Sequence, residues 1–106
     1  MNKFMRMLVF FDLPVTTKKE RKIATQFRKA LIDDGYHRVQ YSVYARVCNG
    51  LKAVEKHRAR LYGILPNKGS VRLLVITEKQ YESIEILVGK LTEEDTSFVA
   101  EQLTIF

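Results

Sequence analysis

The sequence has no tryptophan, a single cysteine and two prolines among its 106 residues. One cysteine, Cys48, excludes an internal disulfide and every zinc site built on a cysteine cluster, and this usage fits the reducing cytosol. No apolar run approaches the roughly 18 residues that cross a bilayer, and no signal of secretory type opens the chain. We therefore expect a cytoplasmic protein that does not contact membranes.

Acidic residues are also in short supply, with 12 Asp and Glu against 18 Lys and Arg. The resulting net charge of +6 favours an anionic partner, of which nucleic acid is the commonest. A chain of this length buries only roughly 60 to 65% of its unfolded surface on folding, so a monomer would be only marginally stable. A dimer is therefore expected.

The most informative stretch is the first apolar run, from Met5 to Phe11. It is apolar on both pleat faces apart from Arg6, which predicts a central strand covered on both sides. The run leads directly into Asp12 and stops at Pro14. Because open α/β sheets place their chemistry at the ends of such strands, Asp12 is a candidate site residue.

Two helices are expected. The first opens on a capping box at residues 17–20 and ends at Gly35, and the second begins at an Asn49 cap and ends before a turn at residues 66–69. The positions at helical spacing are Ile23, Phe27, Ala30 and Leu31 in the first helix, and Leu51, Val54, Arg58, Leu61 and Leu65 in the second.

Strand patterns fill the rest. Residues 37–47 alternate strictly, with Val39, Tyr41, Val43, Ala45 and Val47 on one face and Arg38, Gln40, Ser42, Tyr44 and Arg46 on the other. Whether this segment bends or turns as a tight hairpin stays open. The remaining expectations are a strand at 71–77, one helical turn at 77–80, a short strand at 83–88 and a further strand at 103–106.

Helices alternating with strands in so short a chain indicate an α/β (α+β) sandwich of the ferredoxin-like βαββαβ type. Residues 1–88 are predicted as the domain and 89–106 as its tail. We expect Phe10, Phe27, Tyr41 and Tyr62 in the core. We expect His37 and His57 to be ordinary surface or capping histidines.

Basic residues follow the first helix in two outward rows, one of Lys18, Lys22 and Lys29 and the other of Arg21 and Arg28. A broad basic surface that lacks a base-reading helix, a zinc finger or an aromatic platform suits phosphate contact on duplex DNA without strong sequence preference. The alternative is a solvated helix face.

These features, in this order, resemble the CRISPR-associated protein 2 family of small spacer-acquisition proteins. The matching pieces span essentially the whole chain and are the strand ending in Asp12, the basic helix start, Arg38-Val39-Gln40-Tyr41-Ser42-Val43-Tyr44 and Thr77-Glu78-Lys79-Gln80-Tyr81. The resemblance implies a ferredoxin-like homodimer in which the terminal strand of each protomer completes its partner's sheet.

The resemblance also implies site residues. In the family the matching aspartates of two protomers face each other and have been assigned a metal, which implies Mg²⁺ shared by Asp12 of each protomer. Positions assigned to catalysis or substrate contact carry over onto Lys19, Arg21, Arg38, Ser42 and Tyr44. The family usually has arginine where this chain has Lys19, and lysine cannot make the planar bidentate phosphate contact. Alternatively, Asp12 is structural and supports the following turn or the start of the first helix.

The tail is acidic over residues 92–97 and apolar over 103–106. Chain ends are rarely this apolar unless docked, so the tail is expected to dock on its own domain, on a second protomer or on the partner that the resemblance implies, the integrase subunit CRISPR-associated protein 1.

Three functions are compatible with these observations. The first is a homodimer that holds double-stranded DNA between integrase dimers during spacer acquisition, with chemistry supplied by the partner. The second is a Mg²⁺-dependent endonuclease acting on RNA or double-stranded DNA, with Asp12 as metal ligand and Ser42 or Tyr44 positioning the substrate. The third, a metabolite-binding regulatory dimer, has no Gly-rich loop or polar pocket motif to support it.

Overall fold

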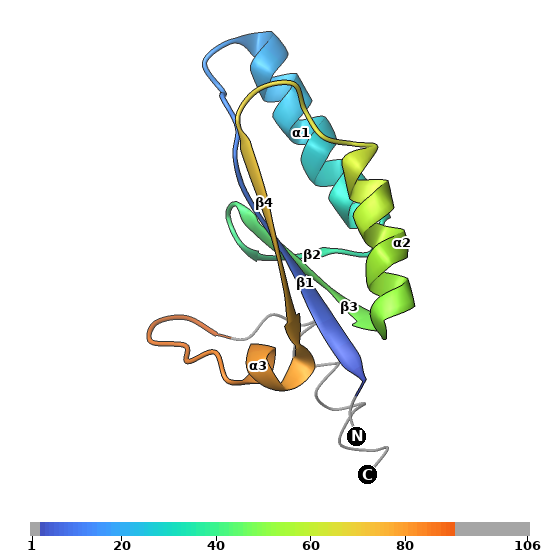
Figure 1. The fold of residues 1–106 in the computed structure, drawn as a ribbon. Helices are drawn as coiled ribbons and strands as arrows, with labels where there is room; N and C mark the ends of the chain where they lie inside the picture. The colour runs from blue at the N-terminus through green and yellow to red at the C-terminus, as the bar shows by residue number, and fades with distance from the viewer. Residues whose placement is uncertain (1–2, 91–106) are drawn as a thin grey trace.

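The computed structural model describes residues 3–90, which form one antiparallel four-stranded sheet and three helices (Figure 1). In chain order the elements are β1 (Phe4–Asp12), α1 (Lys18–Asp33), β2 (His37–Gln40), β3 (Val43–Asn49), α2 (Leu51–Tyr62), β4 (Ser70–Thr77) and α3 (Glu78–Glu82). The strands lie in the order β2-β3-β1-β4, with β1 in the interior of the sheet. The predicted ferredoxin-like fold is confirmed.

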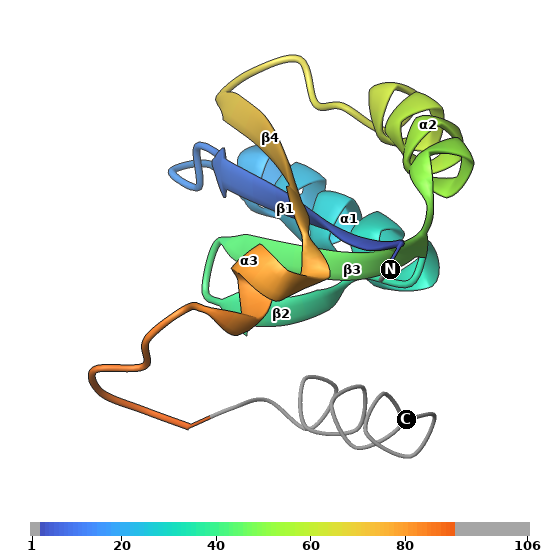
Figure 2. The ribbon, with the colours of Figure 1, turned by 60° about the horizontal axis from the view of Figure 1, so that its bottom comes forward.

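Helices α1 and α2 cover one face of the sheet, and the short α3 lies against the other (Figure 2). The main core lies under α1 and α2, where alternate residues of β1 from Met7 to Phe11 meet both helices. Phe11 packs edge-on against Phe27 of α1, with ring centroids 5.2 Å apart. Among the described residues, none of the helices has the length and apolar character of a membrane span.

The capping box predicted for α1 is present. The Glu20 N–H donates to Thr17 Oγ1 at 3.1 Å, and the Thr17 N–H donates to Glu20 Oε1 at 2.9 Å. The helix buries Ala24, Phe27 and Leu31, whereas the predicted Ile23 is exposed. The apolar stripe therefore lies one residue away from the predicted position at the start of the helix.

The predicted start and face of α2 are wrong. Asn49 is the last residue of β3, and the helix is capped by Gly50, whose φ of +94° is a conformation that favours glycine. The buried positions are Val54, His57 and Leu61, while Leu51 is exposed. His57 fills a core position because it has a carboxylate partner, Asp34.

Residues 37–49 form the tight hairpin β2–β3, with Tyr41 and Ser42 in its turn. The alternating pattern of residues 37–47 separates the side chains into two faces, but it does not show which face the helices cover. Tyr44, which was assigned to the same face as Arg38 and Arg46, is 3% exposed in the core under α1 and α2. Tyr41, predicted for the core, is 70% exposed in the turn. The predictions for Phe10 and Tyr62 are also wrong, since both are exposed, whereas Phe27 is buried as predicted.

A second capping box, between Thr77 and Gln80, opens α3 as predicted. The short strand predicted at 83–88 is absent, because these described residues continue from α3 as turn and irregular backbone. The predicted strand at 103–106 and most of the predicted tail lie outside the described residues.

Arg6 is the charged residue within the apolar strand β1, and its side chain is 2% exposed. Its Nε lies 2.6 Å from Glu78 Oε2 and its Nη2 lies 3.2 Å from Glu78 Oε1, while its Cζ lies 4.1 Å from the centre of the Tyr81 ring. Glu78 is fully buried. This bidentate pair fixes α3 against the sheet face that α1 and α2 leave open.

Candidate nucleic-acid interface

Asp12 lies at the exposed end of β1, where its backbone pairs with Ser70 of β4. Among the described residues, its carboxylate accepts no hydrogen bond and forms no ion pair. The expected contact with the following turn is therefore not made by this side chain. Asp12 is instead a free carboxylate at the rim of the sheet.

A groove of about 250 Å³ lies next to Asp12, between the β1–α1 connection, the start of α1 and the α2–β4 loop. Its lining consists of Leu13, Pro14, Thr17, Lys19, Glu20, Ile23, Pro66, Asn67 and Lys68. The α2–β4 loop approaches closely because Gly69, at φ +92°, has no side chain; a Cβ there would lie 2.6 Å from the Asp12 carbonyl oxygen. The charged side chains of the groove lining are Lys19, Glu20 and Lys68.

Lys18, Lys19 and Lys22 stand exposed in the first turns of α1, and within residues 3–90 they form no ion pair. Positive side chains at a helix N-terminus oppose the helix dipole, at a cost of roughly 0.3–1 kcal/mol each. Lys18 and Lys22, four residues apart, also repel each other. These lysines therefore do not stabilise the helix by themselves, and a phosphate at this position would be stabilised by both the lysines and the helix end.

The other residues predicted to bind nucleic acid differ in whether their side chains already have a partner within the described structure. Arg21 donates from Nη1 to the carbonyl oxygens of Val15 and Thr16, at 3.1 and 3.0 Å, and so supports the loop that leads into α1. Lys29 is paired with Asp33 at 3.1 Å on the exposed face of the helix. Arg38 is exposed on β2.

The two remaining residues implied by the resemblance lie in the β2–β3 hairpin. The Ser42 carbonyl oxygen accepts a hydrogen bond from the Phe11 N–H at 3.0 Å, which holds the turn beside the end of β1. Tyr44 packs against Phe11 with ring centroids 5.5 Å apart, inside the core. Ser42 is therefore near Asp12 along the sheet edge, and the Tyr44 ring supports the strand from within.

Arg28, predicted as part of an open basic row, is half-buried. Its Cζ lies 5.9 Å from the centre of the Phe11 ring and 5.2 Å from that of Tyr41. Its Nε is buried and lacks a hydrogen-bond partner. The sequence prediction missed this arrangement because Tyr41 was placed in the core.

The sheet face opposite α1 and α2 is only partly covered by α3. Leu8, Ala45 and Tyr81 form a small buried cluster there, while Leu74 and Phe10 stay 48% and 37% exposed. An apolar sheet face of this kind commonly packs against another protein surface.

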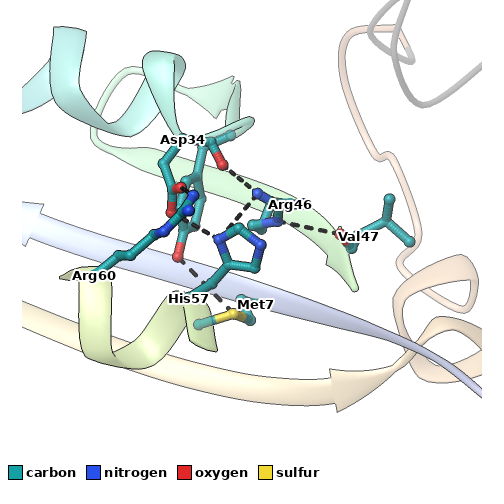
Figure 3. A network of polar contacts seen from close by, with 7 residues as sticks. Met7, Asp34, Arg46, Val47, His57 and Arg60 are labelled. Carbon is teal, nitrogen blue, oxygen red and sulfur yellow. Dashed lines mark hydrogen bonds and ion pairs between the residues drawn. The ribbon is translucent and has the colours of Figure 1, made fainter. Parts of the chain in front are cut away.

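A second polar cluster joins the end of α1 to α2 and β3 (Figure 3). His57 Nδ1 lies 2.8 Å from Asp34 Oδ2, and Arg60 Nη1 lies 2.7 Å from Asp34 Oδ1. Because a carboxylate only accepts, Nδ1 carries the hydrogen, and Arg46 Nη1 donates instead to the Asp34 carbonyl oxygen. His57 is thus paired with an acidic residue, which corrects its prediction as an ordinary surface or capping histidine.

The Asp34 cluster fits a structural role, because its groups satisfy one another. Burial disfavours the Asp34 carboxylate, but the hydrogen bonds and charges of Arg60 and His57 outweigh it and lower the pKa of Asp34 below its ordinary value of 3.8. Because its pKa is lowered in the folded state, the Asp34 carboxylate stabilises the fold at any pH above its ordinary pKa. This contribution is lost as the pH falls through the lower pKa of the folded state.

Replacing Asp34 by asparagine is therefore expected to lower the free energy of unfolding at neutral pH by about 1–3 kcal/mol. The difference from the wild-type protein should shrink as the pH falls below about 4. Urea denaturation over a pH series measures both effects. Asp33→Asn is the matched control, because Asp33 lies in an exposed pair and should change stability by less than about 0.5 kcal/mol. Equal effects of the two substitutions would contradict this account.

No group of three or more His, Cys, Asp or Glu side chains that could hold a metal ion occurs among residues 3–90. Mg²⁺ usually takes one or two carboxylates together with waters and phosphate oxygens. Asp12 supplies one exposed carboxylate, so a magnesium site at this position fits the residues if a second chain brings a second Asp12.

Comparison with known proteins gives a consistent result. Residues 5–84 match the family model described as CRISPR associated protein Cas2. The chain is 49% identical over 102 residues to a "CRISPR-associated endoribonuclease Cas2" of Acidovorax ebreus, covering 96% of this chain and all of the relative. A protein of the same name from Campylobacter jejuni is 43% identical over 105 residues, which is 99% of this chain and 73% of that protein. The crystal structure of Streptococcus pyogenes Cas2 at pH 6.5 superposes with a TM-score of 0.57 at 28% identity, covering 78% of this chain and 99% of that one.

Proposed function

The chain belongs to the Cas2 family of CRISPR-associated proteins, and we propose that it acts as a homodimer that holds duplex DNA during spacer acquisition, beside the integrase subunit CRISPR-associated protein 1. The observation that carries this proposal is the cluster of Lys18, Lys19 and Lys22, which opposes the dipole of α1 and has no acidic partner within the described residues. Such a cluster contacts phosphates without reading bases.

Dimer formation is supported by the open sheet face. Phe10 and Leu74 are partly exposed there, beside a small apolar cluster. Pairing two such faces would bury apolar surface that a domain of this size leaves in contact with water. In this proposal the tail, which includes the apolar residues 103–106, docks on the partner protomer or on the integrase subunit.

The second candidate is a metal-dependent endonuclease, which is favoured by the names of the relatives and by the exposed carboxylate of Asp12. Asp12 of each protomer would then hold Mg²⁺, whose chemistry is the activation of water for phosphodiester hydrolysis. Ser42 would position the substrate from the hairpin turn beside β1, whereas the buried Tyr44 would support the strand from within the core.

Substitution of Asp12 by asparagine separates the two candidates. We expect the purified integrase complex carrying Asp12→Asn to integrate spacers nearly as well as the wild-type complex. The stability of the protein should change by less than about 0.5 kcal/mol, because the carboxylate is exposed and unpaired in the described structure.

The measurement compares integration by the two complexes, with folding and dimer content checked by circular dichroism and light scattering. RNA and DNA cleavage by the isolated proteins is measured in parallel. A folded, dimeric mutant that no longer integrates would return the active site to this chain and contradict the DNA-holding role.

A further inference from the structure

Tyr41, like Tyr62, is an aromatic side chain that was predicted for the core and is instead largely exposed. It lies in the β2–β3 turn and is 70% exposed. A single exposed aromatic residue needs no special explanation. What distinguishes Tyr41 is the guanidinium group of Arg28, which lies 5.2 Å from the centre of its ring.

Arg28 is held without an acidic partner in the described structure. Its contacts there are with the aromatic rings of Phe11 and Tyr41, and its Nε is both buried and without a hydrogen-bond partner. A partly desolvated positive charge without a counter-charge is unfavourable, and a phosphate group close to the guanidinium would compensate for it. The aromatic contacts also fix the orientation of the Tyr41 ring.

The location connects this pair with the proposed interface. Arg28 projects from α1, the same helix that carries the lysine cluster at its start. The Tyr41 ring therefore lies on the helix side of the sheet and stays accessible when the opposite face is covered. The hairpin turn is bound to the end of β1 through the Ser42 carbonyl oxygen and the Phe11 N–H, one residue before Asp12.

We propose that Tyr41 and Arg28 form a stacking site for an unpaired nucleobase of a nucleic-acid strand. One face of the Tyr41 ring contacts Arg28, and the other face takes the base, while Arg28 takes the phosphate next to that base. This inference rests on the proposed nucleic-acid role and extends it from duplex phosphates to an unpaired base.

The test uses single strands of roughly 10 nucleotides, a length in the range of typical strand-binding sites. The probes are a DNA strand, an RNA strand of the same sequence and an abasic DNA strand with the same number of phosphates. Binding is measured by fluorescence anisotropy for the wild-type protein and for Tyr41→Ala, Tyr41→Phe and Arg28→Gln. Tyr62→Ala is the matched control, because Tyr62 is 71% exposed on α2.

We expect Tyr41→Ala to weaken binding of base-containing strands about ten-fold, within the range that stacking of one base contributes, and to leave the abasic strand unchanged. Tyr41→Phe, which keeps the ring, should retain wild-type affinity, as should Tyr62→Ala. Arg28→Gln should weaken binding of base-containing and abasic strands alike. Equal effects on the DNA and RNA strands indicate recognition of the base and phosphate, whereas a difference between them shows which sugar the site accepts; both results support the site.

Two results would overturn the inference. The first is a Tyr41→Ala protein, folded by circular dichroism, that binds every strand as the wild-type protein does. The second is a Tyr41→Ala protein whose binding of the abasic strand is weakened as much as its binding of the base-containing strands. A blunt duplex measured in parallel identifies the source of failure: if the duplex binds and the stacking effect is absent, only this inference fails, whereas a protein that binds neither duplex nor single strand contradicts the proposed function as well.

Discussion

Replacing Glu78 by glutamine is expected to lower the free energy of unfolding by about 3–5 kcal/mol, the loss typical of a broken buried ion pair. Arg6 is 2% exposed and its guanidinium faces the Glu78 carboxylate, so the substitution removes a full negative charge from beside a buried positive one. The loss should also release α3 from the sheet, since the pair and the Tyr81 ring join these two elements. Urea denaturation followed by circular dichroism measures the change.

Two variants serve as controls for this experiment. Glu82→Gln changes an exposed carboxylate of the same helix and should alter stability by less than about 0.5 kcal/mol. The double substitution of Arg6 by methionine and Glu78 by leucine removes both charges and should recover most of the lost stability, because apolar side chains of similar volume often replace a buried pair without net cost. A Glu78→Gln protein as stable as the wild type would show that the pair is not important for the fold.

Local signals in the sequence predicted most of the secondary structure. The capping boxes at Thr17 and Thr77 each depend on residues three positions apart, so the sequence contains all that is needed to identify them. The apolar character of both faces of β1, apart from Arg6, likewise predicted its interior position in the sheet. Hydrophobic alternation across β2 and β3 was less informative, because both sheet faces are covered in part and Tyr41 lies in a turn where alternation stops.

The sequence predicted those features of the candidate site that depend on local spacing and charge, but not the pairs between residues far apart in the chain. The exposed lysines at the start of α1 follow from helical spacing and charge. The pairs of His57 with Asp34 and of Arg6 with Glu78 join residues 23 and 72 positions apart, so only the folded chain shows them. An arginine in an apolar strand indicates that a buried carboxylate is needed. It does not indicate which carboxylate, and the buried Glu78 at the start of α3 was therefore missed.

Reversing the charges of Lys18, Lys19 and Lys22 to glutamate is expected to weaken binding of a blunt DNA duplex by at least about 100-fold near physiological salt. Each phosphate that a lysine contacts releases counterions on binding, and losing up to three such contacts in each protomer removes most of a sequence-independent interaction. The loss should be the same for duplexes of unrelated sequence. These residues are exposed, so the fold should persist.

The matched control carries the same change in net charge on the second helix, with Lys52, Lys56 and Arg58 reversed to glutamate. This protein loses the same long-range attraction but keeps the cluster at the start of α1. We expect its affinity for the duplex to fall by about ten-fold or less. Equal losses for the two triple variants would mean that net charge, rather than the position of the cluster, determines binding.

The salt dependence of duplex binding tests the central claim most directly. If the dimer contacts about four to six phosphates, the plot of log affinity against log salt concentration should have a slope near −4 to −5 for the wild-type protein. For the variant with Lys18, Lys19 and Lys22 reversed, the slope should fall to roughly 0 to −1, because the dimer then carries six reversed lysines and each lost phosphate contact removes about 0.9. A slope that is the same for both proteins, or one that changes with the sequence of the duplex, would contradict phosphate binding by the start of α1.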